Sequence, residues 1–220
     1  MTLNKSLNIA LPKGRILDSV LPILLKVGIE PEKSFFDRND RKLKFKTNIN
    51  NIEIIRVRSF DVVTFLAYGA AQMAFVGSDI LDEFNHAEVY SPLDLKIGKC
   101  KMVVAAEKDV VTNEDPRSWS HVRVATKYPN ITRKHFEARG VHAECIKLNG
   151  AMEIAPSLGL CRRIVDLVST GSTLKANGLE EIEEISKITS SLVINRAAMK
   201  TRPGDIHGWI TRFEEARDAA

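Results

Sequence analysis

The stretch from Ile164 to Gly178 constrains the fold of this chain more than any other. It reads Ile-Val-Asp-Leu-Val-Ser-Thr-Gly-Ser-Thr-Leu-Lys-Ala-Asn-Gly, a short β-branched apolar run followed by hydroxyl residues around one glycine and then by helix-forming residues. Apolar runs of this length are typical of a buried strand in a parallel sheet. We therefore expect a strand over 164–168, a tight loop over 169–173 and a helix start at Leu174.

A strand, a hydroxyl-rich loop and a helix start together favour an anion site. Backbone N–H groups at the start of a helix point into the preceding loop, and the positive end of the helix dipole adds to their effect. Ser and Thr hydroxyls supply further donors, and Gly171 lets the backbone approach a ligand closely. An ordinary turn capped by Ser172 or Thr173 fits the same pattern. Composition alone leaves both interpretations open.

The composition describes a globular protein and excludes few functions. Of its 220 residues, 44% are hydrophobic and 27% are charged, and the net charge is +4. That charge is too small and too interspersed to indicate nucleic-acid binding, but it suits small polyanionic ligands. Cys100, Cys145 and Cys161 form no Cys-x-x-Cys pair, which fits a reducing compartment. Because the sequence shows no signal peptide and no membrane-spanning run, we expect a cytoplasmic protein with no membrane partner and no nucleic-acid partner.

Strands and helices alternate through most of the chain, which predicts an α/β fold. From 94 to 120 the alternation gives way to extended segments and a loop, which we interpret as a crossover between two lobes. The region from 182 to 195 shows both helical and strand-like spacing, so its structure stays open. The strands expected before the crossover are 7–11, 41–47, 52–57 and 74–76.

Basic residues lie at the strand ends of the first lobe. Lys13 and Arg15 follow the first strand, Arg58 follows the third, and Arg41 opens the second. Ligands of open α/β sheets bind beyond the carboxyl ends of the strands, so these side chains are candidates for a ligand with two separated phosphate groups. Solvated charges flanking turns are the alternative interpretation.

Asp166 lies in the strand that leads into the hydroxyl-rich loop. An acid beside a phosphate loop is the arrangement expected for a ribose 5-phosphate, because the carboxylate accepts hydrogen bonds from sugar hydroxyls. The sequence contains no Walker A loop, no Gly-x-Gly-x-x-Gly, no nucleophile elbow and no metal-ligand spacing among its five histidines. We therefore favour chemistry by positioning and charge neutralisation over covalent catalysis.

Several blocks in order along the chain resemble the motifs of the ATP phosphoribosyltransferase family. The signature block runs from Glu153 through Gly159 to Leu174, and Ile9 to Arg15 resembles the N-terminal motif. Together the matching blocks extend from about Leu7 to Asn195. The other matching blocks are Arg58 to Gly69, Val76 to Asp79, Lys99 to Lys101, Ala125 to Tyr128 and Ala176 to Leu179.

The resemblance implies an α/β fold of two lobes, similar to the type II periplasmic binding proteins, with the active site in the cleft between the lobes. It also implies that the chain returns after the signature block to complete the first lobe. On this basis the first lobe comprises residues 1–95 and 182–220, and the second lobe comprises residues 96–181.

The reaction implied by the resemblance joins N1 of ATP to C1 of 5-phosphoribosyl 1-pyrophosphate and releases pyrophosphate. Mg²⁺ would accompany the substrates, without a fixed protein metal site. Arg15 and Arg41, with Lys13 nearby, are the expected catalytic residues, because they would neutralise the departing pyrophosphate. The residues expected to bind phosphoribosyl pyrophosphate are Glu153, Asp166, Ser169, Thr170, Gly171, Ser172 and Thr173. Those expected to bind ATP are Gly14, Arg58, Asp79 and Tyr128.

One segment departs from the family pattern. Between Gly159 and Ile164 the chain reads Leu-Cys-Arg-Arg, where family members often have small residues and an acid. Either Arg162 points into solvent, or the ribose end of the site is more basic than usual.

The resemblance also implies partners. The chain ends near Ala220 without the further domain that binds histidine in the long forms of the family. It is similar to the short form, which implies a homodimer and a separate regulatory subunit resembling histidyl-tRNA synthetase. A non-enzymatic two-lobe ligand-binding protein and a phosphoribosyltransferase with another base as acceptor are the alternatives.

Overall fold

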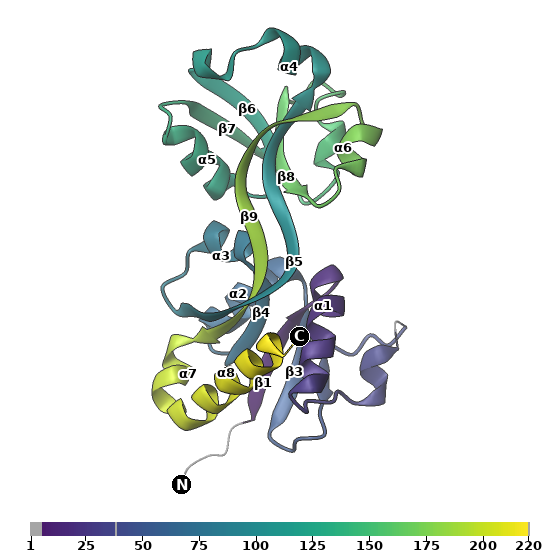
Figure 1. The fold of residues 1–220 in the computed structure, drawn as a ribbon, viewed down its shortest axis with the longest axis vertical. Helices are drawn as coiled ribbons and strands as arrows, with labels where there is room; N and C mark the ends of the chain where they lie inside the picture. Colours follow the sequence, from purple (N-terminus) through teal and green to yellow (C-terminus); the bar gives the residue numbers. More distant parts are fainter. Residues whose placement is uncertain (1–5, 38, 220) are drawn as a thin grey trace. The chain divides into compact units, whose positions relative to one another are not determined.

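The structure is a computed structural model that describes residues 6–37 and 39–219 (Figure 1). Its internal contacts divide the chain into two compact units, of which unit 1 comprises residues 1–98 and 189–220 and unit 2 comprises residues 99–188. The chain passes from one unit to the other inside two strands, β5 (Val89–Glu107) and β9 (Leu179–Asn195). The boundaries expected from the sequence lie within the same two strands.

Unit 1 is built around a mixed sheet with the strand order β2-β3-β1-β4-β9. Strand β1 is parallel to both β3 and β4, whereas β2 is antiparallel to β3 and β9 is antiparallel to β4. The strands are β1 (Leu7–Pro12), β2 (Lys44–Lys46), β3 (Ile52–Val57) and β4 (Met73–Gly77). The helices are α1 (Arg15–Lys26), η1 (Lys33–Phe36), α2 (Ser59–Ala67), α3 (Ser78–Phe84), α7 (Arg196–Thr201) and α8 (Pro203–Asp218).

Helices cover both faces of this sheet. Ile9 and Leu11 of β1 are fully buried in a core cluster that includes Phe213 of α8 and residues of α1. Ala10 belongs to a second cluster with Val62 of α2 and residues of α3. Successive residues of a strand point to opposite faces, so a strand covered on both faces must be apolar throughout. This explains the continuous apolar character of 9–11.

Unit 2 contains a second part of the sheet, in the order β9-β5-β8-β6-β7. Strand β6 is parallel to β7 and β8, and β5 is antiparallel to β8. The core below the loop after β8 contains Val103, Ile164 and Leu174. The remaining elements are α4 (Lys108–Asn113), η2 (Pro116–Ser118), β6 (His121–Thr126), α5 (Pro129–Glu137), β7 (His142–Lys147), η3 (Met152–Ile154), β8 (Arg163–Val168) and α6 (Ser172–Ala176).

Two expectations about the elements were wrong, and the structure decides a third region that the sequence left open. Within 94–120, the part predicted as a loop, residues 110–120, contains most of α4 and all of η2, and the extended segments before it belong to one strand of 19 residues. For residues 152–158 the sequence also predicts a short helix, but the structure has only the 3₁₀ turn η3 there, since Pro156 has no N–H to continue it. The region at 182–195, which the sequence left open, is all strand: its Ile, Thr and Val side chains favour extended backbone, and residues 190–194 pair with β4.

A half-buried carboxylate ties β9 to α5 within unit 2. Glu183 lies 3.0 Å from His135 Nε2, and both Nη atoms of Arg139 donate to it at 2.7 and 2.8 Å. Burial raises the pKa of Glu183, but the hydrogen bonds from His135 and Arg139 outweigh burial and lower the pKa to about 2. The ionised carboxylate therefore stabilises the fold.

We expect Glu183→Gln to lower the free energy of unfolding at pH 7 by about 3 kcal/mol. A carboxyl with a pKa of 4.5 when unfolded and about 2 when folded adds stability above pH 4.5 and loses it as the pH falls toward 2. The difference in the free energy of unfolding between wild type and Glu183→Gln should therefore become smaller between pH 4.5 and pH 2. Urea unfolding of both proteins at pH 7, 4 and 3 measures this difference. A difference that does not change with pH would contradict the lowered pKa of Glu183.

Candidate active site

The loop predicted at 169–173 forms where β8 ends and α6 begins. Gly171 has φ +75° and ψ 4°, a left-handed conformation that glycine adopts at little cost. Thr170 Oγ1 and Ser172 Oγ lie 3.1 Å apart across it. The local sequence folds this way because the apolar run ends at Val168 and the glycine permits the sharp reversal. The loop thus has the glycine and the hydroxyl groups of an anion-binding turn.

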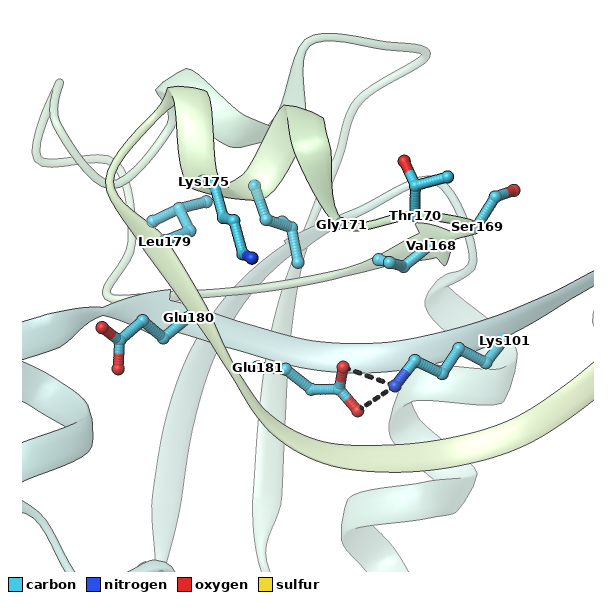
Figure 2. Close-up of a pocket in the computed structure, with 10 residues that line it drawn as sticks. Lys101, Val168, Ser169, Thr170, Gly171, Lys175, Leu179, Glu180 and Glu181 are labelled. Carbon is cyan, nitrogen blue, oxygen red and sulfur yellow. Dashed lines mark hydrogen bonds and ion pairs between the residues drawn. The ribbon is translucent and has the colours of Figure 1, made fainter.

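A pocket of about 630 Å³ opens beside this loop in unit 2 (Figure 2). Ser169, Thr170 and Gly171 line it, together with residues of β5, α6 and β9. Figure 2 shows the hydroxyls of Ser169 and Thr170 pointing away from an ion pair between Lys101 and Glu181. Among the described residues expected to bind phosphoribosyl pyrophosphate, the lining leaves out Glu153, Asp166, Ser172 and Thr173.

Asp166 and Glu153 come from different segments of unit 2. Asp166 is half-buried in β8 opposite Val103, and its Oδ1 accepts the N–H of Leu167 at 2.8 Å. It therefore lies on the strand that ends in the loop. Glu153 is half-buried in the 3₁₀ turn η3.

Tyr128 lies at the same edge of the sheet as the loop. It follows β6, which is parallel to β8, so the carboxyl ends of both strands meet at one edge. The backbone N–H of Tyr128 donates to Thr126 Oγ1 at 2.9 Å, and that hydroxyl donates to the carbonyl of Val165 at 2.8 Å. The fully buried Thr126 thus joins the ends of β6 and β8.

In unit 1, the expected residues after the parallel strands share one edge of the sheet. Lys13 and Arg15 follow β1, Arg58 follows β3 and Asp79 follows β4. Because β2 is antiparallel to β3, the chain before β2 reaches the same edge, and Arg41 lies three residues before β2. The structure thus brings the basic side chains of unit 1 to the carboxyl ends of its parallel strands, where all four are exposed.

Two glycines shape this edge. Gly14 has φ +96° and ψ −157°, a conformation that other residues rarely adopt, and it precedes Arg15 at the start of α1. At Gly77, an added Cβ would lie 2.1 Å from Asp79 Oδ1, so the buried carboxyl group packs where a side chain would stand. Both glycines therefore lie one or two residues before a candidate functional residue, where a larger side chain would be strained or would clash.

The departure from the family pattern lies at the other end of β8 from the loop. Arg162 is 60% exposed, and its Nη1 lies 2.5 Å from Glu114 Oε1. Arg163 is buried, pairs with the same carboxylate, and stacks 4.0 Å from the ring centroid of Trp119. Burial lowers the pKa of Arg163 and raises that of the Cys161 thiol. Glu114 and Asp109 pair with these two cations, and the phosphate loop follows the opposite end of the strand, so both arginines lie away from the loop.

Sequence reasoning gave no role to Lys101 or Thr126. Both lie inside blocks that match the family motifs, and this match is the one feature of the sequence that points to them. Their contacts join strands that are far apart in the sequence, so residue spacing could not reveal what they touch.

In residues 6–37 and 39–219, no group of three or more His, Cys, Asp or Glu side chains is placed to hold a metal ion. No helix within the part of the chain that the structure describes is long and apolar enough to cross a bilayer.

Comparison with known proteins shows the fold and the family. A protein titled periplasmic aliphatic sulphonate binding protein SsuA from Escherichia coli matches with a TM-score of 0.57 at 13% identity, over 97% of this chain and 68% of that one. It confirms the fold expected from the sequence, that of the type II periplasmic binding proteins. The Thermotoga maritima structure titled ATP phosphoribosyl transferase (HisG:HisZ) complex matches with a TM-score of 0.81 at 32% identity, over 97% of this chain and 100% of that one.

Sequence relatives agree with this structural match. An ATP phosphoribosyltransferase of Paramagnetospirillum magneticum is 59% identical over 98% of this chain and 99% of its own length. One of Rhodospirillum rubrum is 60% identical over 96% of this chain and 93% of its own length. The family model HisG, described as ATP phosphoribosyltransferase, matches residues 58–215. This chain therefore belongs to the ATP phosphoribosyltransferase family.

Proposed function

We propose that this chain transfers the phosphoribosyl group of 5-phosphoribosyl 1-pyrophosphate to N1 of ATP. The products are N1-(5-phosphoribosyl)-ATP and pyrophosphate, and the reaction is the first step of histidine biosynthesis. The observation that carries the proposal is the loop after β8, where Gly171 is left-handed between hydroxyl residues and Asp166 precedes it on the strand. Identity to enzymes of this name along nearly the whole chain supports it.

The loop and the acid before it would hold the phosphoribosyl group. A left-handed residue in a turn lets successive backbone N–H groups converge on one anion, here the 5-phosphate. Thr170 and Ser172 add hydroxyl donors to the same turn. Asp166 and Glu153 would accept hydrogen bonds from the ribose hydroxyls.

The basic edge of unit 1 would serve the departing pyrophosphate. As the bond from C1 to the pyrophosphate oxygen breaks, its electron pair leaves with pyrophosphate, and the lone pair of adenine N1 forms the new bond to C1. Positive charge develops on the ribose and negative charge on the leaving group. Arg15 and Arg41, with Lys13, would neutralise that negative charge, which is larger in the transition state than in the substrate. Gly14, Arg58, Asp79 and Tyr128 are the proposed ATP contacts.

The carboxylates near the phosphate loop suit a Mg²⁺ ion that arrives with the substrates. Mg²⁺ prefers carboxylate and phosphate oxygens and usually keeps several waters, so one or two protein carboxylates suffice. Asp166 and Glu153 are the residues that would hold it. When bound, the ion would neutralise phosphate charge.

A direct assay tests the proposed function. The protein is incubated with ATP, phosphoribosyl pyrophosphate and Mg²⁺, and the ultraviolet absorbance of the N1-alkylated adenine is followed. Parallel reactions replace ATP with GTP or with free adenine. Product with ATP alone supports the proposal. Product with another base instead would favour a different phosphoribosyltransferase, and no product with or without a regulatory partner would favour a ligand-binding protein.

We further propose that the chain forms a homodimer in the cytoplasm and binds a regulatory subunit like the HisZ of the Thermotoga maritima complex. We expect the purified chain to turn over but to ignore histidine, because the inhibitor would act through the partner. Initial rates with and without histidine, measured with the chain alone and after adding the partner, test this. Strong inhibition of the chain alone would refute it.

A further inference from the structure

The segment from Ser169 to Gly178 connects β8 to β9, and Lys101 of β5 meets one residue before this segment and one after it. Strand β5 lies between β9 and β8 in the sheet. Lys101 of β5 is the register partner of Val168, the last residue before the loop. Its Nζ lies 2.7 Å from Oε1 and 2.6 Å from Oε2 of Glu181, near the start of β9. Lys101 therefore joins the base of the loop on one side to the strand on which the segment returns.

This ion pair lies beside the loop and not on its hydroxyl side. Lys101 and Glu181 line the same pocket as Ser169, Thr170 and Gly171. Figure 2 shows the Lys101–Glu181 pair on one side of the loop and the Ser169 and Thr170 hydroxyls pointing away from it. Since Lys101 Nζ is paired with both carboxylate oxygens of Glu181, we consider its effect on the loop through Glu181.

Leu174 anchors α6 in the buried core of unit 2, whereas the hydroxyl-bearing residues of the loop are exposed. Helix α6 has only five residues, and the contact inside the loop between Thr170 and Ser172 does not reach another strand. The Lys101 and Glu181 side chains are 35% and 32% exposed, so their ion pair contributes little to the stability of the whole fold. Its loss should therefore act locally, on the geometry of the loop.

We propose that Lys101 is a positioning residue that holds the phosphate loop in place through Glu181 and so sets the affinity for phosphoribosyl pyrophosphate. The inference rests on the proposed function, since it concerns one substrate of that reaction. It assigns Lys101 no contact with the substrate.

Steady-state kinetics of three variants test the inference. Lys101→Ala and Glu181→Gln should each raise KM for phosphoribosyl pyrophosphate about tenfold, while kcat and KM for ATP change less than about twofold. The double variant should match the single variants, because both remove the same interaction. Lys101→Arg should retain most of the affinity, since its guanidinium can still pair with Glu181.

A second cross-strand ion pair in unit 2 provides the matched control. Arg123 Nε lies 2.9 Å from Glu144 Oε2, its register partner, and joins β6 to β7 away from the loop. Arg123→Ala should leave KM for phosphoribosyl pyrophosphate unchanged. A similar rise in KM for this control would mean that the effect is general destabilisation, which overturns the inference.

Two other results would also overturn the inference. One is an unchanged KM in both Lys101→Ala and Glu181→Gln. The other is a lower KM in Glu181→Gln, because a lysine released from its partner would then bind the substrate directly. Calorimetric titration with phosphoribosyl pyrophosphate gives a second readout that needs no turnover. If the wild type binds phosphoribosyl pyrophosphate but forms no product with ATP, the proposed function fails. The calorimetric titration would then still show whether Lys101 affects the affinity for phosphoribosyl pyrophosphate.

Discussion

Arg15→Ala is expected to lower kcat by roughly 10²-fold or more, with a much smaller change in KM. Arg15 is the first residue of α1, held at the carboxyl edge of the unit 1 sheet by the preceding Gly14. The negative charge on pyrophosphate grows as the C1–O bond breaks, so a cation placed for it stabilises the transition state more than the substrate. Single-turnover rates at saturating substrates measure the chemical step.

Arg196 provides the matched control for this variant. It is an exposed arginine at the first position of α7, in the same unit, and it also follows a strand. Because β9 is antiparallel to β4, Arg196 lies at the opposite edge of the sheet from Asp79. Arg196→Ala should therefore keep its kcat. An unchanged kcat in Arg15→Ala would show that Arg15 is a solvated residue of the turn and does not stabilise the leaving group.

Local signals were enough to predict the strand, loop and helix of the phosphate loop. The β-branched run to Val168 can bury itself only as a strand, and Gly171 supplies the conformation that the reversal needs. The alternation of strands and helices in unit 1 was predictable for the same reason, since each strand is covered on both faces and reads as a continuous apolar run.

The contacts between distant segments were not predictable. Lys101 and Glu181 are 80 residues apart, and Glu183 and His135 are 48 apart. Arg163 depends on Glu114, 49 residues earlier, for the neutralisation of its charge. The spacing in β9 fits both a helix and a strand, and its pairing with β4 decides in favour of the strand. Such pairings arise from the topology, which a single sequence states only indirectly.

Gly171→Val is expected to abolish measurable binding of phosphoribosyl pyrophosphate. An added Cβ at Gly171 would meet only Val168 Cγ1, at 3.9 Å, so crowding inside the protein is not the obstacle. The obstacle is the φ of +75°, which a β-branched residue adopts only with strain. Relief of that strain would turn the loop N–H groups away from their common point, and the site for the 5-phosphate would be lost.

Gly140 separates the loss of the site from general strain. It has φ +73°, lies in the turn between α5 and β7, and has no atom within 4 Å of an added Cβ. Gly140→Val should therefore carry similar backbone strain but bind phosphoribosyl pyrophosphate normally. Gly171→Asn should recover part of the affinity, because asparagine tolerates the left-handed region better than valine does. Isothermal titration calorimetry measures all three variants, and normal affinity in Gly171→Val would show that the loop does not hold the phosphate.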